Sequence, residues 1–339
     1  MSSHSFIFPK PILPPKAVKK SAASLSVLLK EEYLLLDSSF RDGLQLLNQL
    51  SHHLQKPSEK APYREQKLFA QQFRKQSSYL LVPILDHQIQ LQGAPECGFL
   101  KEFYPEHSEF LLPFPQVQEL AGAWLQYRDG IKFPVLGHRL HPFYGTYFPK
   151  RTAHLELFAT WLHQYQGAKE SCVDMGAGSG ILSFLLERKG FQSILAIDYN
   201  PNAIESIQRE VQRHSYQHIK PILSNLFTEI KDEVELIVFN PPWIRGESDS
   251  LVNQALFSDE KLLQHFFEQA HQRLKPAGRI VLVYSNIGSL LFPKEPHPLF
   301  AELDKGRFTL AQKLQRKIKP SSPQKRTKEK VEIWELIKK

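Results

Sequence analysis

The sequence predicts an α/β protein in which a doubly wound sheet occupies the C-terminal part and a smaller α+β domain precedes it. Two observations predict this. From Cys172 onward, strand-like segments alternate with amphipathic helices, and a glycine-rich turn joins the first of these strands to a helix. A chain of 339 residues is long enough for two domains, which we place at residues 1–130 and 131–339.

Composition excludes several classes of protein. Hydrophobic residues make up 42% and charged residues 23% of the chain, which is ordinary for a protein that buries a core. No apolar stretch approaches the ~18 residues of a membrane span, and the proline-rich start lacks the apolar centre of a signal peptide. Cys97 and Cys172 have no metal-ligand spacing. We therefore expect a cytoplasmic protein with no membrane partner and no metal.

The first domain is predicted to mix helices with extended segments. Apolar residues recur at helical spacing after a cap at Asp37 or Ser38, and a polar helix follows. The expected elements are helices at residues 40–54, 62–76 and 116–127 and an extended segment at 79–91. None carries a catalytic motif, so we interpret the domain as an accessory or cap domain, with a recognition module as the alternative.

The second domain alternates strands with helices, which is typical of a parallel sheet covered on both faces. Pro201 suits the first turn of a helix, where a missing N–H costs nothing, and Pro276-Ala277-Gly278 is expected to end another helix. The expected strands are residues 171–175, 193–198, 219–223, 234–239, 279–285, 308–318 and 331–337, and the expected helices are residues 181–189, 201–214 and 258–274.

A glycine-rich turn follows the first strand of this domain. Its glycines, which let the backbone turn tightly and approach a ligand, are Gly176, Gly178 and Gly180. A dinucleotide fingerprint would need glycine or alanine where Ile181 stands, so the spacing favours a cofactor without a pyrophosphate. Asp198 ends the next strand, where a carboxylate can accept hydrogen bonds from ribose hydroxyls. A purely structural glycine turn is the alternative.

The tetrapeptide Asn240-Pro241-Pro242-Trp243 leaves the end of a predicted buried strand, at the edge of the sheet where ligands bind. Paired prolines stiffen the backbone there. The Asn240 side-chain oxygen and the Pro241 carbonyl can accept hydrogen bonds from an NH₂ group, and Trp243 offers a face for a planar substrate. These features predict alignment of a planar amino nitrogen for group transfer; a Pro-Pro turn with Trp243 in the core is the alternative.

Residues 173–180 and 196–201 resemble the first two motifs of the class I, or Rossmann-like, S-adenosylmethionine-dependent methyltransferases. The resemblance implies a seven-stranded sheet with an antiparallel last strand and S-adenosylmethionine as cofactor. It also implies that Asp174 and the glycine turn hold the methionine end, Asp198 the ribose, and residues 224–227 the adenine. Members usually have aspartate where Asn225 stands; an amide oxygen can still accept a hydrogen bond there, without the charge.

Two further segments extend the resemblance. Asn-Pro-Pro followed by an aromatic residue resembles methyltransferases that modify planar amino nitrogens, in nucleic acid bases or in protein glutamine. Residues 141–151 resemble the Tyr-Gly-x-x-x-Pro-x-Arg segment of bacterial members with a methyltransferase small domain. It implies that Tyr144, Gly145, Pro149 and Arg151 border the cofactor pocket. Residues 1–140 have no counterpart in this resemblance.

The net charge of +8 is concentrated at the C-terminal end, where residues 306–339 hold 11 basic and 3 acidic side chains. The resemblance implies that the loop between the last two strands emerges beside Trp243. Its basic candidates for phosphate contacts are Lys317, Lys319, Lys325, Arg326 and Lys328. A solvated charge run that serves only solubility is the alternative.

These features lead to a first hypothesis: an N-methyltransferase acting on an exocyclic amino nitrogen of a base in RNA, or less readily DNA, with the base unstacked into the pocket. A protein glutamine-N5 methyltransferase is the second hypothesis. Small-molecule methyltransferases seldom carry this tetrapeptide and rank below it. The last is a non-catalytic binding module that keeps the cofactor fold, in which Asn240 would be dispensable.

Overall fold

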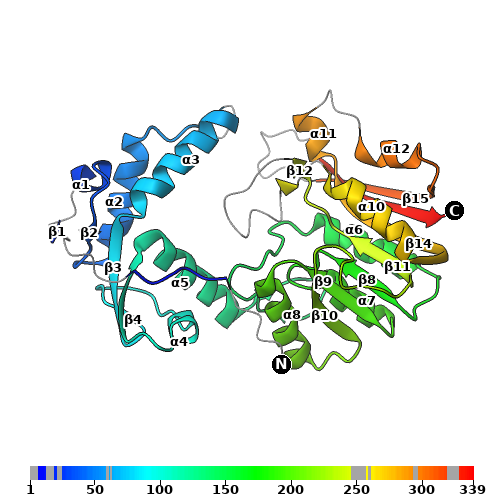
Figure 1. Cartoon of the computed structure of the whole chain (residues 1–339), viewed down its shortest axis with the longest axis horizontal. Helices are drawn as coiled ribbons and strands as arrows, with labels where there is room; N and C mark the ends of the chain where they lie inside the picture. The colour runs from blue at the N-terminus through cyan, green and yellow to red at the C-terminus, as the bar shows by residue number, and fades with distance from the viewer. Residues whose placement is uncertain are drawn as a thin grey trace. The chain divides into compact units, whose positions relative to one another are not determined.

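The computed structural model describes residues 7–12, 19–20, 25–58, 61, 63–245, 257–258, 261–292, 297–318 and 328–339. It divides the chain into an N-terminal unit, Phe8–Asp129, and a C-terminal unit that holds Gly130–Lys339 and also Ile7 (Figure 1). Among the described residues, no helix combines the length and the apolar character that a membrane crossing requires.

The N-terminal unit contains a small mixed sheet with helices around it. The central strand β3 pairs in parallel with β2 and antiparallel with β4 and β5. The strands are β1 (Lys19–Lys20), β2 (Leu34–Leu35), β3 (Leu80–Leu85), β4 (Gln88–Ile89) and β5 (Glu109–Pro113). The helices are α1 (Leu25–Leu29), α2 (Phe40–His53), α3 (Tyr63–Ser77), α4 (Phe99–Phe103) and α5 (Phe114–Asp129).

The N-cap of helix α2 is Ser39, rather than Asp37 or Ser38, so the helix begins at Phe40. The Ser39 hydroxyl accepts a hydrogen bond from the Asp42 N–H at 3.1 Å, and the Asp42 carboxylate accepts one from the Ser39 N–H at 3.1 Å. This reciprocal capping box needs an acidic side chain three residues after the cap, which only Ser39 has here. The predicted cap position is therefore wrong.

The C-terminal unit is built on a seven-stranded sheet with the order β10-β9-β8-β11-β14-β16-β15. The first five of these strands pair in parallel, whereas β16 lies antiparallel between β14 and β15. The strands are β8 (Cys172–Met175), β9 (Ile194–Asp198), β10 (Ile219–Leu223), β11 (Val234–Phe239), β14 (Leu274–Ser285), β15 (Phe308–Lys317) and β16 (Lys330–Lys338). The predicted seven-stranded sheet with an antiparallel last strand is confirmed.

Helices cover both faces of this sheet. One core cluster joins α6 and α7 to one face, as with Phe158 and Phe184, and another joins α10 to the other face through Phe266. The helices are α6 (Ala153–Gln164), α7 (Ile181–Lys189), α8 (Pro201–His214), α10 (Leu262–Arg273), α11 (Ile287–Leu291) and α12 (Pro298–Leu303). Two short pairs complete the unit: β6 (Ile131–Lys132) with β7 (Arg139–Leu140), and β12 (Ile244–Arg245) with β13 (Phe257–Ser258).

Three details differ from the predicted elements. Helix α6 was not expected, although Leu155, Phe158 and Leu162 recur at helical spacing and are buried. Ser258 belongs to β13, so α10 starts only at Leu262. Strand β14 begins at Leu274, and residues 276–278 form an irregularity inside it, because the register with β11 shifts between Val234 and Leu236.

The ends of the strands place several segments at one edge of the sheet. Phe239 at the end of β11 pairs with Met175 at the end of β8, so the glycine turn and the Asn-Pro-Pro-Trp segment leave the same edge. Ser285 ends β14 and pairs with Val331, and Lys317 pairs with Lys330. The connection between β15 and β16 therefore emerges at this edge as well.

Candidate active site

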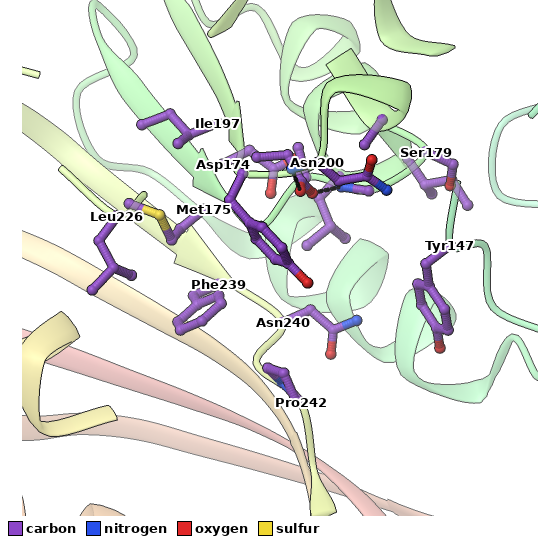
Figure 2. Close-up of a pocket in the computed structure, with 18 of the residues that line it drawn as sticks. Tyr147, Asp174, Met175, Ser179, Ile197, Asn200, Leu226, Phe239, Asn240 and Pro242 are labelled. Atoms are coloured by element: carbon purple, nitrogen blue, oxygen red, sulfur yellow. Dashed lines mark hydrogen bonds between the residues drawn. The ribbon is translucent and has the colours of Figure 1, made fainter. Parts of the chain in front are cut away.

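A cavity opens at this edge of the sheet, between the ends of β8, β9, β10 and β11 (Figure 2). It encloses about 1050 Å³ of space, a volume that includes open solvent at its mouth. Its lining includes the glycine turn, Asp198, Asn225 and Asn240, which lie far apart in the chain. The fold therefore brings seven of the ten predicted catalytic and cofactor-binding residues to one place.

The glycine turn adopts a backbone that other residues rarely adopt. Gly176, Gly178 and Gly180 have φ angles of 62°, 53° and 81°. A Cβ atom on Gly178 would lie 3.2 Å from the backbone oxygen of Tyr147, so a side chain would crowd the wall of the cavity. The Gly178 N–H donates to Asp198 Oδ2 at 2.8 Å, which ties the turn to the next strand.

Asp174 is the residue before the last of β8, beneath the turn, and is 1% exposed. Its Oδ2 accepts a hydrogen bond from the Ser183 hydroxyl at 2.6 Å, while Oδ1 is buried without a hydrogen-bond partner among the described residues. Burial raises the pKa of this carboxyl to about 7, against a smaller lowering by Ser183. Asp174 thus presents one carboxylate oxygen that a ligand's donor can satisfy.

Asp198 and Asn200 organise the opposite wall. Asp198 Oδ1 accepts from the Asn200 N–H at 2.9 Å, and burial raises the pKa of Asp198. Each carboxylate oxygen keeps a second lone pair for a ligand hydroxyl. Asn200 caps α8 by accepting from the Asn202 N–H, and its side-chain nitrogen donates to the Gly145 carbonyl at 2.9 Å. Asn225 follows β10, lines the cavity and is exposed.

The Asn-Pro-Pro-Trp segment contributes two of its four residues to the cavity, Asn240 and Pro242. Asn240 Oδ1 is buried and has no hydrogen-bond partner among the described residues. Pro241 is buried but does not line the cavity, and neither does Trp243, whose indole N–H donates to the Val283 carbonyl at 3.2 Å. Stacking of a substrate on Trp243 stays a prediction.

Two further lining residues, His154 and Tyr147, were not selected from the sequence. The His154 ring lies 5.2 Å from the Trp243 ring, edge to face at 89°, and its Nε2 is buried without a partner among the described residues. Burial lowers the pKa of His154 to about 4, so the ring is neutral near pH 7. A single histidine in an unpredicted helix gives no sequence signal; recognising α6 would have placed it beside the glycine turn.

The segment at residues 141–151 is fastened to α8. Asn202 Nδ2 donates to the Tyr144 carbonyl at 2.9 Å, and the Thr146 hydroxyl donates to the Asn202 carbonyl at 3.0 Å. Pro149 lines the cavity together with Tyr147. Arg151 instead forms an ion pair with Glu329 at 3.0 Å, near the start of β16. The structure thus places this segment along the cavity, with Arg151 directed to the β15–β16 connection.

Of the predicted basic candidates, Lys317 and Lys328 are exposed at the two ends of the β15–β16 connection. Lys319, Lys325 and Arg326 lie outside the described residues. Two other basic residues of β15 are engaged within the protein: Lys313 pairs with Glu332 at 3.1 Å, and Arg316 pairs with Glu156 at 2.7 Å. The described part of this surface is therefore less basic than the sequence alone suggests.

Strand order, glycine turn and cavity together define the class I, Rossmann-like S-adenosylmethionine-dependent methyltransferase fold. The cavity suits that cofactor, because the Asp174 oxygen without a partner, the Asp198 carboxylate and a turn without side chains face a common space. The sequence pattern of the "Methyltransferase small domain" family matches residues 155–289. This match covers 135 of the 339 residues, so it is this part of the chain that is similar to the methyltransferase small domain.

Relatives of known name each match about a third of the chain. The ribosomal protein L11 methyltransferase of Geobacillus thermodenitrificans is 30% identical over 121 residues, covering 35% of this chain and 33% of the relative. The release factor glutamine methyltransferase of Streptococcus pneumoniae is 32% identical over 125 residues, covering 33% and 44%. The chain thus spans about a third to under half the length of these relatives.

A solved structure of a ribosomal protein L11 methylase from Lactobacillus delbrueckii subsp. bulgaricus is also similar. It is 18% identical, has a TM-score of 0.42, and the match covers 59% of this chain and 85% of that one.

Proposed function

We propose that this chain is an N-methyltransferase whose acceptor is a planar NH₂ nitrogen. Asn240 carries the proposal, because this residue lines the cavity and its Oδ1 is buried with no hydrogen-bond partner among the described residues. An acceptor N–H would satisfy this oxygen. The hydrogen bond would turn the lone pair of a conjugated nitrogen toward the methyl donor, and Pro242 would limit movement of the nitrogen.

S-adenosylmethionine supplies an electrophilic methyl group on a sulfonium sulfur. Asp174, Asp198 and the glycine turn would hold this cofactor; its methyl group would pass from sulfur, which keeps the electron pair of the broken bond, to the acceptor nitrogen, and the proton released from that nitrogen would go to water. His154 is proposed as a positioning residue, because its neutral ring can accept a second N–H near the same place. Trp243 braces that ring edge to face.

For the substrate, a base in RNA is our first candidate. It is supported by the excess of basic residues at the C-terminal end and by the exposed Lys317 and Lys328, which lie at the edge of the sheet where the cavity also opens. Phosphates bound there would position a base that is unstacked into the cavity. The N-terminal unit is proposed as an accessory domain for the same substrate.

A glutamine side chain in a protein is the second candidate, favoured by the name of the Streptococcus pneumoniae relative, a release factor glutamine methyltransferase. The primary amide of glutamine is also planar and would make the same hydrogen bond with Asn240. If the substrate is a protein, the basic residues Lys317 and Lys328 would have no role in phosphate binding.

The test is transfer of a tritiated methyl group from S-adenosylmethionine, by the full chain, to total RNA, DNA and protein from cells that lack the gene. The RNA proposal expects label that ribonuclease removes and that the Asn240→Ala variant does not produce. Label in protein, found at glutamine after hydrolysis, would overturn RNA in favour of the second candidate. Absence of label from all three fractions would refute macromolecular methylation.

A further inference from the structure

We propose that the C-terminal unit holds a divalent transition metal, with Zn²⁺ as the best fit, at His138, Glu210 and His214. His138 lies in the loop between β6 and β7, and the other two lie one turn apart at the end of α8. One ligand atom from each residue falls within 4.8 Å of the others. The three residues have no ligand spacing in the sequence, since the loop and the helix end are about seventy residues apart.

Two polar atoms in this cluster lack partners. Glu210 is fully buried, and its Oε2 has no hydrogen-bond partner among the described residues; the same is true of His214 Nε2. These two atoms are 3.5 Å apart. Tetrahedral zinc with bonds of about 2.0–2.1 Å places its ligand atoms roughly 3.3 Å from one another, so this pair already has the spacing of one edge of such a site.

The His138 ring lies against the His214 ring, with centroids 3.9 Å apart and planes 31° apart, so it must turn for its nitrogen to serve as the third ligand. Its Nδ1 lies 2.9 Å from the Arg139 carbonyl, to which it donates a hydrogen bond in the tautomer that leaves a lone pair on Nε2. A backbone carbonyl commonly fixes a metal-binding histidine in this way. The Tyr216 hydroxyl, 2.9 Å from Nε2, now occupies that lone pair and can turn away when a metal binds.

The charges around the cluster permit a cation but weaken its binding. Arg213 pairs with Glu210 through Oε1, which leaves Oε2 for a metal and holds the carboxylate in place. His141 is the other basic side chain whose charge acts on His214. Two imidazoles and one carboxylate form a common zinc ligand set, with a fourth position for water. In the competing arrangement, a protonated His214 pairs directly with Glu210.

Such a site would fasten the β6–β7 loop to the C-terminal end of α8. The N-terminal half of that helix already holds residues 143–146: Ser206 accepts from the Phe143 N–H at 3.0 Å, and Asn202 holds Tyr144. A metal at the other end would fix the start of the segment that continues to Tyr147 and Pro149 in the cavity wall. Its role would be structural, separate from methyl transfer.

The test uses the full chain without an affinity tag. Metal content is measured by mass spectrometry, Zn²⁺ affinity by competition with a chromophoric chelator, and melting temperature with Zn²⁺ or with EDTA. We expect one bound Zn²⁺ per chain and a higher melting temperature with Zn²⁺. In His214→Ala and His138→Ala, affinity should fall at least tenfold, whereas His163→Ala, which changes an exposed histidine elsewhere, should not alter it.

His138 is half-exposed in a loop, so His138→Ala keeps the proposal testable if the α8 variant does not fold. Zn²⁺ affinity that is unchanged in His138→Ala, or a wild-type chain that takes up no Zn²⁺, would overturn the proposal and favour the direct His214–Glu210 pair. None of these measurements depends on methyl transfer, so the metal site and the proposed function can fail independently.

Discussion

Replacing Asn240 by alanine removes the proposed acceptor-binding oxygen with little expected effect on the fold. Because Oδ1 has no partner among the described residues, its loss leaves no buried donor unsatisfied there. We expect a change in folding free energy within about 0.5 kcal/mol, and so a melting temperature within roughly 2 °C of wild type. Loss of one aligned hydrogen-bonding group in a transition state costs about 2.7–4 kcal/mol, or a fall in kcat of roughly 10²–10³-fold.

The assay is methyl transfer to the fraction that accepts label, under saturating S-adenosylmethionine, with cofactor affinity measured by calorimetry. Asn240→Asp keeps an oxygen in place and should retain more activity than Asn240→Ala. Asn48→Ala, which changes an exposed asparagine in α2, is the matched control. Wild-type kcat in Asn240→Ala would refute the reasoning, and so would a lost kcat accompanied by a large fall in melting temperature, because the residue would then be structural.

Three further predictions test the cavity and its surroundings. In Gly178→Ala, we expect the affinity for the cofactor, measured by calorimetry, to fall at least tenfold. Gly190 also has a positive φ angle, but no atom lies within 4 Å of the position that its Cβ would take. Gly190→Ala should therefore lower only the free energy of unfolding, by about 1–2 kcal/mol. Since burial raises the pKa of Asp174 to about 7, the cofactor-free fold should lose stability as pH rises from about 4 through 7, and melting curves of Asp174→Asn should lack that loss. If RNA binds, Lys317→Ala with Lys328→Ala should reduce the salt-dependence slope of its affinity by about 1.4; an unchanged slope would exclude these phosphate contacts.

The alternation of strands and helices in the C-terminal unit could be predicted because the central strands β8 and β11 are buried on both faces, whereas a helix such as α8 is buried on one. Val173, Ile237 and Val281 are fully buried in three neighbouring strands, which gives the continuous apolar runs of a parallel sheet. The glycine turn was equally readable, since its positive φ angles restrict the residue type. Burial and backbone conformation restrict the residue type at each position, so both can be recognised from the sequence.

What could not be predicted depends on contacts between distant residues. The irregular start of β14 places Ala277 at a φ of 58° inside a strand, where tertiary pairing with β11 outweighs the local turn preference. Lys313 and Arg316 belong to the basic excess of residues 306–339, but their partners Glu332 and Glu156 come from β16 and α6. A count of charges cannot show which of them pair across the fold.

Three buried polar atoms belong to residues that line the cavity, although no spacing pattern in the sequence connects these residues. Asp174 Oδ1, His154 Nε2 and Asn240 Oδ1 are buried without hydrogen-bond partners among the described residues, and all three residues line the same cavity. They come from the end of β8, the start of α6 and the residue after β11. Because an unpaired buried polar atom costs about 1–3 kcal/mol, their convergence stores an unfavourable free energy that ligands with N–H donors can relieve. In the proposed reaction, the amino group of the methyl donor and the NH₂ group of the acceptor would supply such donors.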